Sequence, residues 1–261
     1  MTILLTYLAL GAAAGTIAGL FGLGGGIIIV PALVIAFQSQ GISAELIMHM
    51  AIASSLATIV LTSLSSIYAH HQKQAIRWEL FTWIALGILL GSWLGVQTAI
   101  SLDGAVLQMI FGVFLLVVAL IIGFNIAPDR GRSMPGKPGL SIAGIGIGWF
   151  SALLGIGGGT LSVPFFTWCN LRMQSAVALA AACGLPIALM GTLANMYEGW
   201  GISVLPPYSA GYIYLPAVAA IAITSVPFAR IGAKLAHRLP ARQLKQAFAL
   251  VLVAVGIKFI L

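Results

Sequence analysis

The stretch Gly22-Leu23-Gly24-Gly25-Gly26, followed by four residues and then Pro31, decides the fold of this chain. The same pattern, G-x-G-G-G-x4-P, returns 133 positions later as Gly155-Ile156-Gly157-Gly158-Gly159 and Pro164, in a chain of 261 residues. Both copies interrupt long apolar stretches, although a glycine costs about 1 kcal/mol relative to alanine in a helix interior. The pattern therefore predicts an internal repeat with a broken helix in each half, which in a membrane protein is typical of a transport site.

The composition indicates a membrane protein. Apolar residues make up 61% and charged residues 7% of the chain, against about 25% charged residues in a soluble domain, and the mean hydropathy is +1.10. Apolar runs of about 20 residues, the length that crosses a bilayer, leave no room for a soluble catalytic domain. The 12 basic residues outnumber the 5 acidic ones. Because they lie in short loops between spans, they indicate orientation in the membrane and not nucleic-acid binding.

The repeat extends beyond the glycines. Residues of the second half, among them Phe248, match residues of the first half, among them Phe111, at a constant offset of 137. The segment APDRGRSMPGKP between the halves has three prolines, two glycines and four charged residues, and its turn chemistry predicts a loop. We therefore predict a first transmembrane repeat over 1–126, a cytoplasmic linker over 127–138 and a second transmembrane repeat over 139–261.

The distribution of charge decides the number of crossings. If each glycine-containing stretch crosses the bilayer once, five Lys or Arg residues fall on one side and six on the other, whereas most membrane proteins show a bias. If each motif is the turn of a helical hairpin, the same eleven residues fall on one face and only Lys258 lies on the other. The predicted fold is therefore an all-α multi-pass membrane protein of two inverted-topology repeats, each with a glycine-broken helical hairpin. It has eight apparent spans and about ten helical segments.

The second arm of each hairpin is short. Ile27–Phe37 has eleven residues and reaches about 16 Å, half a bilayer, so its N-terminus lies near the midplane. Unpaired amide groups and the positive end of the helix dipole favour an anion there. Pro31 and Pro164 lie too deep for a first helical turn and are predicted to kink or end these helices. The predicted substrate-binding positions of the two motifs are Gly24, Gly25, Gly26, Ile27, Gly157, Gly158, Gly159 and Thr160.

Close helix packing is the alternative role for these glycines. Three consecutive glycines exceed what a small-xxx-small pattern needs, and they recur, but packing alone stays open for both clusters. For glycines inside the long spans, packing is the predicted role, at Gly15, Gly19, Gly87, Gly91, Gly95, Gly144, Gly146 and Gly148.

The paired motifs, together with the step into the last helix at Ala233–Pro240 (AKLAHRLP), resemble the sulfite exporter TauE/SafE family of membrane permeases. The resemblance covers essentially the whole chain. It implies a permease of the bacterial inner membrane for a small sulfur-containing anion such as sulfite, thiosulfate or an organosulfonate, exported with the proton gradient. The chain departs from the family's A-V-G-T-S pattern, because 51–55 read A-I-A-S-S and 176–180 in the second half lack both hydroxyls.

Hydroxyl side chains form one face of the span after the first motif. The stripe consists of Ser55, Thr58, Thr62 and Ser66 (or Ser65) at helical spacing, with Ser54 beside it. Such a stripe lines a polar path or bonds to a neighbouring helix, and Ser54, Ser55 and Thr58 are taken as substrate-binding candidates. Cys183, in the matching span of the second half, is a further candidate, with a small buried hydrophobe as the alternative.

Three histidines belong to this span or its end. Glu45 and His49, four residues apart near its outer end, are the candidates for proton coupling. A buried acid–histidine pair is typical of a proton relay, and an interfacial pair in contact with water is the alternative. His70 and His71 lie in a basic cytoplasmic segment and are predicted to be solvated.

The predicted function is therefore proton-coupled transport of a small sulfur-containing anion. The alternatives are a passive anion channel and a permease for another small organic anion. No catalytic residue, metal site or cofactor is predicted, since neither G-x-S-x-G nor H-E-x-x-H occurs. The expected partners are the anion, protons and the lipid bilayer, with a homodimer left open and nucleic acid excluded.

Overall fold

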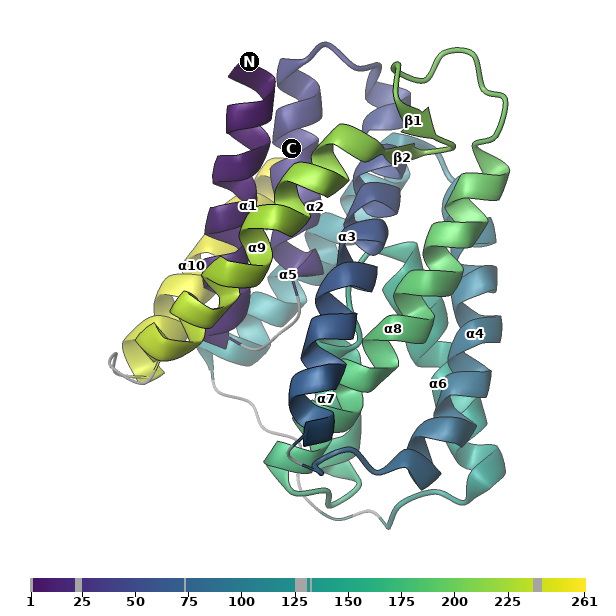
Figure 1. Ribbon diagram of the computed structural model, residues 1–261, viewed down its shortest axis with the longest axis vertical. Helices are drawn as coiled ribbons and strands as arrows, with labels where there is room; N and C mark the ends of the chain where they lie inside the picture. Colours follow the sequence, from purple (N-terminus) through teal and green to yellow (C-terminus); the bar gives the residue numbers. More distant parts are fainter. Residues whose placement is uncertain (1, 22–24, 73, 125–130, 132, 237–240) are drawn as a thin grey trace.

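The computed structural model describes residues 2–21, 25–72, 74–124, 131, 133–236 and 241–261. Within these residues the chain forms ten α-helices and one antiparallel two-stranded hairpin (Figure 1). The first five helices are α1 (Thr2–Phe21), α2 (Gly26–Ser39), α3 (Ala44–Gln72), α4 (Trp78–Ile100) and α5 (Gly104–Gly123). The other five are α6 (Lys137–Leu153), α7 (Gly159–Trp168), α8 (Met173–Glu198), α9 (Leu215–Ala236) and α10 (Ala241–Ile260), with β1 (Ser209–Ala210) and β2 (Ile213–Tyr214) before α9.

Both glycine motifs break the helices, as predicted. The first lies between α1, which ends at Phe21, and α2, which begins at Gly26. The second lies between α6, which ends at Leu153, and α7, which begins at Gly159. α2 has 14 residues and α7 has 10, so at 1.5 Å per residue both are too short to cross a bilayer.

The two motif prolines do not end these helices, so of the two predicted effects only a kink remains a prediction. Pro31 lies inside α2, which continues to Ser39, and Pro164 lies inside α7, which continues to Trp168. A proline removes one hydrogen bond to the carbonyl group four residues earlier. Pro31 and most of its neighbours in α2 are buried, and this packing holds the helix together past the missing bond.

Several helices suit a bilayer. α3, α4, α5 and α8 are long and apolar enough to cross it, and α2 and parts of α1, α9 and α10 are shorter apolar helices. Large apolar side chains are exposed along the outer faces of α4 and α5, among them Leu86, Leu90, Val113 and Val117. A soluble protein does not present such continuous apolar faces to water. The chain is an all-α multi-pass membrane protein.

Glycines bring α4 and α6 into backbone contact. Cβ atoms at Gly87, Gly91 and Gly95 would overlap the carbonyl oxygens of Ser141, Ile145 and Trp149. In the same way, Gly11 and Gly15 bring α1 against the backbone of Ile221 and Ser225 in α9. The packing role is thereby confirmed at Gly15, Gly87, Gly91, Gly95, Gly144 and Gly148, and the surroundings of Gly19 lie outside what the structure describes.

The packing role predicted for Gly146 is wrong. Gly146 is exposed, and a Cβ atom there would meet no heavy atom within 4 Å. It lies two residues from both Gly144 and Gly148, which face α4. Because two residues correspond to more than half a helical turn, Gly146 points to the opposite side of α6.

The helices pair across the two halves of the chain. α1 packs along α9, α4 along α6, α5 along α10 and, at the centre, α3 along α8 (Figure 1). The β1–β2 hairpin lies at one end of the bundle, where the Tyr214 amide donates a 3.0 Å hydrogen bond to the Ser54 hydroxyl of α3.

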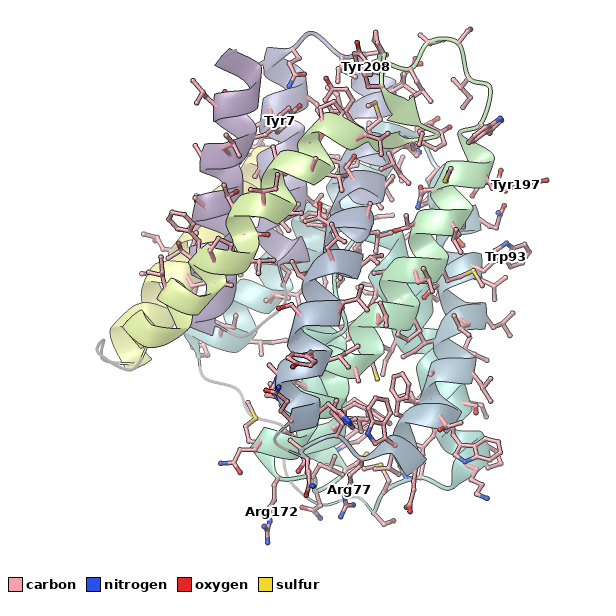
Figure 2. The ribbon with its side chains drawn as sticks, in the orientation of Figure 1. Tyr7, Arg77, Trp93, Arg172, Tyr197 and Tyr208 are labelled. Carbon is pink, nitrogen blue, oxygen red and sulfur yellow. The ribbon has the colours of Figure 1, made fainter. Side chains whose placement is uncertain are left out.

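The two ends of the bundle differ in their side chains. Arg77, which precedes α4, and Arg172, which precedes α8, lie together at one end, and Tyr208 lies at the other (Figure 2). We refer to the end that carries Arg77 and Arg172 as the basic end. The N-terminus and the β1–β2 hairpin are at the opposite end (Figure 1).

Candidate functional site

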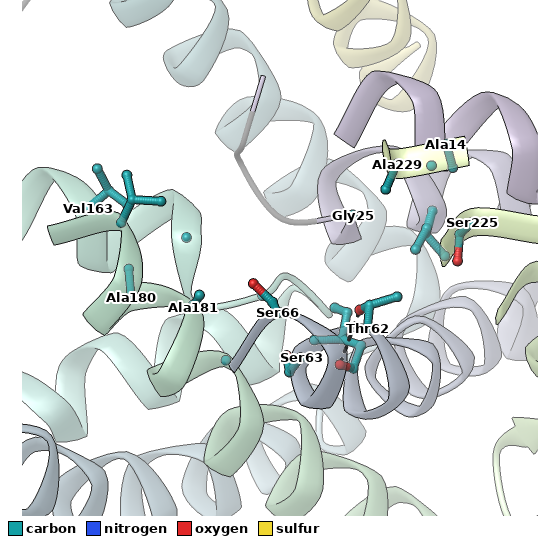
Figure 3. Close-up of a pocket in the computed structure, with 18 of the residues that line it drawn as sticks. Ala14, Gly25, Thr62, Ser63, Ser66, Val163, Ala180, Ala181, Ser225 and Ala229 are labelled. Atoms are coloured by element: carbon teal, nitrogen blue, oxygen red, sulfur yellow. Dashed lines mark hydrogen bonds between the residues drawn. The ribbon is translucent and has the colours of Figure 1, made fainter. Parts of the chain in front are cut away.

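A partly open cavity of about 250 Å³ lies between the two halves of the chain. Its walls come from α1, α2, α3, α7, α8 and α9, and Figure 3 shows Ser63 and Ser66 of α3 between Ala180 on one side and Gly25 on the other. Most of the lining is glycine, alanine, valine or isoleucine. Among the described residues, no Asp, Glu, Lys or Arg side chain lines the cavity.

Both glycine motifs reach this cavity. Gly25 is the N-cap residue of α2 and Gly158 that of α7, and neither helix has a side-chain cap. Gly25, Gly157, Gly158 and Gly159 all line the cavity. The first amide groups of a helix lack intrahelical partners and form the positive end of its dipole. One wall of the cavity is therefore an electropositive surface built from backbone atoms.

The two motifs also contact each other. A Cβ atom at Gly26 would lie 2.6 Å from the Gly155 carbonyl oxygen and 2.6 Å from Ile156 Cα. Gly155 has a φ of +66°, a conformation that favours glycine, and the Ser55 hydroxyl donates a 2.8 Å hydrogen bond to its carbonyl oxygen. Gly26 and Gly155 thus allow close packing, whereas their neighbours Gly25 and Gly157 face the cavity. Gly24 lies outside the described residues.

The predicted hydroxyl stripe on α3 divides into two parts. Toward the hairpin end, all three hydroxyls form hydrogen bonds within the protein. The Ser54 hydroxyl accepts one from the Tyr214 amide, and the Ser55 hydroxyl donates one to the Gly155 carbonyl oxygen. The Thr58 hydroxyl donates one to the Ser54 carbonyl oxygen. These three residues are fully buried and do not line the cavity. Toward the basic end, Thr62, Ser63 and Ser66 do line it. The sequence pattern missed Ser63, which lies beside the stripe and becomes part of the lining because the cavity is wider than one row of side chains.

The Ser63 and Ser66 hydroxyls have no hydrogen-bond partner within the described part of the chain. Thr62 and Ser225, which also line the cavity, donate to carbonyl oxygens of their own helices at 3.2 and 3.5 Å. Ser63 and Ser66 therefore add two available donors to the helix N-termini. Backbone amides and hydroxyls, without a carboxylate beside them, suit a small anion.

Comparison with known proteins agrees with this architecture. The sequence profile of the family "Sulfite exporter TauE/SafE" matches residues 7–259. The chain belongs to the sulfite exporter TauE/SafE family. A probable membrane transporter protein of Haemophilus influenzae is 37% identical over 261 residues, covering 100% of this chain and 99% of its own. Another from Methanocaldococcus jannaschii is 25% identical and covers 95% of this chain and 91% of its own.

More distant relatives carry the same description. The probable membrane transporter protein YunE of Bacillus subtilis is 27% identical over 73% of this chain and 77% of its own. No solved structure matches the chain. Together with the family assignment, these relatives identify the chain as a membrane transporter and not an enzyme.

Three other predicted site residues of this TauE/SafE protein lie outside the cavity lining. Ile27 is buried in α2, Thr160 is buried in the first turn of α7, and Cys183 is fully buried in α8. Cys183 precedes Gly184, which does line the cavity and whose Cβ atom would lie 2.9 Å from the Ser63 hydroxyl. The Cys183 thiol is therefore enclosed by protein, next to the site but not facing it.

The proton-coupling candidates lie at the end opposite the basic end. The Glu45 side chain is exposed, and the His49 side chain is buried. His49 Nδ1 lies 3.0 Å from the Glu45 backbone carbonyl oxygen, and Nε2 lies 3.2 Å from the carbonyl oxygens of Ala99 and Leu102. His49 therefore connects α3 to the end of α4 through backbone groups. Its contact with Glu45 does not involve the carboxylate.

Nearby in the β1–β2 loop, Tyr212 packs against the His49 ring with centroids 5.7 Å apart. Burial, and secondarily the Glu198 carboxylate, raises the pKa of the Tyr212 phenol. Within the described residues no group of three His, Cys, Asp or Glu side chains is placed to hold a metal ion. Both cysteines are buried, and neither forms a disulfide bond within the described residues.

Proposed function

We propose that this TauE/SafE protein transports a small sulfur-containing anion, such as sulfite, thiosulfate or an organosulfonate, across the bacterial inner membrane. One observation carries the proposal. Two helix N-termini without side-chain caps, at Gly25 and Gly158, meet in one cavity, and among the described residues no carboxylate lines it. Each helix end stabilises an anion by about 0.3–1 kcal/mol, and by up to about 2 kcal/mol when partly buried. Such a site binds an oxyanion modestly and releases it readily.

The proposed architecture is two inverted repeats, 1–126 and 139–261, joined by the linker 127–138, with eight apparent spans. If α1–α5 correspond to α6–α10, then the pairs α1–α9 and α4–α6 are equivalent, and α3–α8 and α5–α10 are self-equivalent; all four pairs are packed. The shared location of Arg77 and Arg172 supports helical hairpins at the motifs, since single crossings would place these residues on opposite sides. The basic end then faces the cytoplasm.

A carrier suits these observations better than a passive channel. The cavity extends from the glycine motifs toward the basic end, where α3 ends and α8 begins. On its other side, Gly26 is packed against Gly155 and Ile156. Beyond that contact the rings of Tyr7, Phe37 and Tyr214 pack with centroids 5.9–6.4 Å apart. A site that is reached from one side and closed on the other is the geometry of alternating access.

Proton coupling is part of the proposal. Glu45 and His49 do not line the cavity, so a proton bound to the substrate itself, as in bisulfite, fits the described site without a relay between them. Coupling by His49 predicts that His49→Ala changes the pH dependence of flux, whereas a substrate-borne proton predicts that it does not.

The function is tested by binding and flux with purified protein. We expect sulfite, thiosulfate or sulfoacetate to raise the melting temperature, because a ligand of the folded state stabilises it by about 2.7 kcal/mol at a concentration 100 times its Kd. Taurine, which carries a compensating ammonium group, is the control and should have a smaller effect. In proteoliposomes the same anions should accumulate when a proton gradient is imposed. Binding and flux that are absent for every sulfur-containing anion would refute the proposed substrate class.

The inverted architecture is tested by thiol labelling. Cysteine variants Arg77→Cys, Arg172→Cys and Tyr208→Cys, in a background where Cys169 and Cys183 are replaced by alanine, provide exposed sites on both ends of the bundle. We expect a membrane-impermeant maleimide to label the two arginine positions from the cytoplasmic face and position 208 from the other. Labelling of positions 77 and 172 from opposite faces contradicts the hairpins.

A further inference from the structure

Ser63 combines deep burial with an unused hydroxyl group. It is 7% exposed and lines the cavity (Figure 3), and among the described residues its hydroxyl has no hydrogen-bond partner. Other polar residues of the same wall are already engaged. Thr62 donates to the Ile59 carbonyl oxygen, and His70, which is half-buried and not solvated as predicted, interacts within the protein. A buried hydroxyl without a partner is unfavourable, so a ligand that accepts its hydrogen bond recovers that loss.

A missing side chain on α8 leaves room beside this hydroxyl. Gly184 lines the cavity, and a Cβ atom there would lie 2.9 Å from the Ser63 hydroxyl oxygen and 3.5 Å from the Gly158 amide nitrogen. The hydroxyl of α3 and the N-terminus of α7 therefore flank one small space. Because hydrogen bonds join atoms at about 3 Å, a small anion in front of Gly184 is within reach of both.

The other half of the chain does not repeat this arrangement. With residues 51–55 aligned on 176–180, Ser63 corresponds to Ala188, which has no hydroxyl and does not line the cavity. A Cβ atom at Gly25, the N-cap of α2, would meet only Ile29 within 4 Å among the described residues beyond its chain neighbours. Both helix N-termini attract negative charge, but the described unpartnered, buried hydroxyl lies beside α7.

We propose that the Ser63 hydroxyl donates a hydrogen bond to an oxygen atom of the transported anion and is the residue that selects oxyanions. Gly184 serves this contact by leaving open the space between Ser63 and the N-terminus of α7. The inference rests on the proposed function of the cavity. Helix N-termini attract anions of many kinds, whereas a hydroxyl group favours an anion that is a good hydrogen-bond acceptor. Ser63 therefore discriminates an oxyanion from an anion of diffuse charge such as iodide.

The first test compares anions by titration calorimetry on the purified full-length protein. The probes are thiosulfate and methanesulfonate, which are oxyanions, and iodide, which accepts hydrogen bonds poorly. Ser63→Ala should lower the affinity for the oxyanions roughly 10- to 100-fold, the loss expected for one hydrogen bond to a charged acceptor, and should change iodide affinity little. The matched control is Ser65→Ala, an exposed serine of the same helix that does not line the cavity. It should bind all three anions as the wild type does.

The second test fills the space in front of Gly184. In Gly184→Ala the Ser63 hydroxyl can rotate away from the new methyl group, so the protein should fold, and oxyanion affinity should fall at least as far as in Ser63→Ala. Ser63→Ala in the Gly184→Ala background should then cause little further loss, because the hydroxyl has already lost access to the anion. The matched control is Gly191→Ala, since a Cβ atom there would approach the flexible end of Leu56 to 2.8 Å and Gly191 does not line the cavity. It crowds the same pair of helices and should keep wild-type affinity.

The outcomes separate the two proposals. The role of Ser63 is overturned if Ser63→Ala keeps wild-type oxyanion affinity, if oxyanion and iodide affinities fall equally, or if Ser63→Ala has the same effect with and without Gly184→Ala. In each of these cases the anion site itself stands. A wild type that binds neither thiosulfate nor methanesulfonate overturns both the role of Ser63 and the proposed function.

Discussion

Gly157→Val is expected to eliminate anion binding and transport while the protein still folds. Gly157 lines the cavity, and a Cβ atom there would make only ordinary contacts with Ile59, at 3.7 and 3.8 Å. The backbone of Gly157 does not adopt a positive φ, so valine is compatible with its conformation. The added methyl groups then occupy the cavity beside the N-terminus of α7. We expect affinity to fall at least about 100-fold, equivalent to about 2.8 kcal/mol.

Two other motif glycines line the cavity wall near Gly157: Gly158 is a less suitable position for this test, and Gly25 is a complementary one. A Cβ atom at Gly158 would lie 2.6 Å from the Ala180 carbonyl oxygen and 2.7 Å from the Gly184 nitrogen. Substitution of Gly158 therefore displaces α7 from α8, so a loss of binding could not be distinguished from a loss of folding. At Gly25 the nearest obstacle is the flexible end of the Ile29 side chain, at 2.8 Å. Gly25→Val should accordingly repeat the effect of Gly157→Val from the other half of the chain.

The matched control for both variants is Gly146→Val, the same substitution at an exposed glycine that faces open space. It should bind and transport as the wild type does. Binding is measured by calorimetry and folding by the melting temperature and gel-filtration profile without ligand. If folded Gly157→Val and Gly25→Val bind the anion with wild-type affinity, the motif glycines serve packing alone and the cavity is not the anion site.

Gly91→Val is expected to cause the largest loss of stability. A Cβ atom at Gly91 would overlap the carbonyl oxygen of Ile145 in α6, and the neighbouring Gly87 and Gly95 make equivalent contacts one turn away on each side. The helices can relieve the overlap only by moving apart, because a backbone oxygen inside a helix cannot rotate away. Overpacking of this kind costs about 1–3 kcal/mol, and separation of the two backbones adds lost packing along the whole pair.

The measurement is the apparent melting temperature in detergent, with Gly146→Val again as the control on α6. Gly91→Val should melt well below the wild type, and Gly146→Val should melt close to it. Equal melting temperatures for the two variants would mean that α4 and α6 do not rely on glycine contacts. Because α4 also packs against α8, which lines the cavity, the destabilised variant should lose transport as well.

Local patterns predicted the elements of this fold well. Both helix breaks fall within the glycine motifs, because clustered glycines are unfavourable in a helix wherever they occur. Small residues at a spacing of four mark the faces of α1, α4 and α6 that approach other helices. The motif prolines do not end α2 and α7, and in α2 the buried neighbours of Pro31 outweigh one missing hydrogen bond.

The composition of the site was harder to predict, since it depends on which helices meet. Ser55 bonds to Gly155, which is 100 residues away, and Ser54 accepts the amide of Tyr214, which is 160 residues away. These partners form hydrogen bonds with the α3 hydroxyls nearest the hairpin end. The α3 hydroxyls nearest the basic end line the cavity instead. His70 and His49 differ in the same way, because they lie toward opposite ends of α3: His70 lines the cavity and His49 does not.

The sequence by itself therefore determined a helical membrane protein, the position of its two helix breaks and most of the glycine contacts, because each depends on residues within one or two helical turns. Only the tertiary structure decided which glycines face the cavity and which face another backbone. Gly25 and Gly26 are adjacent, yet one lines the cavity and the other packs against Gly155. The physical reason is that adjacent residues of a helix point about 100° apart, so their surroundings are set by the helix packed on each side.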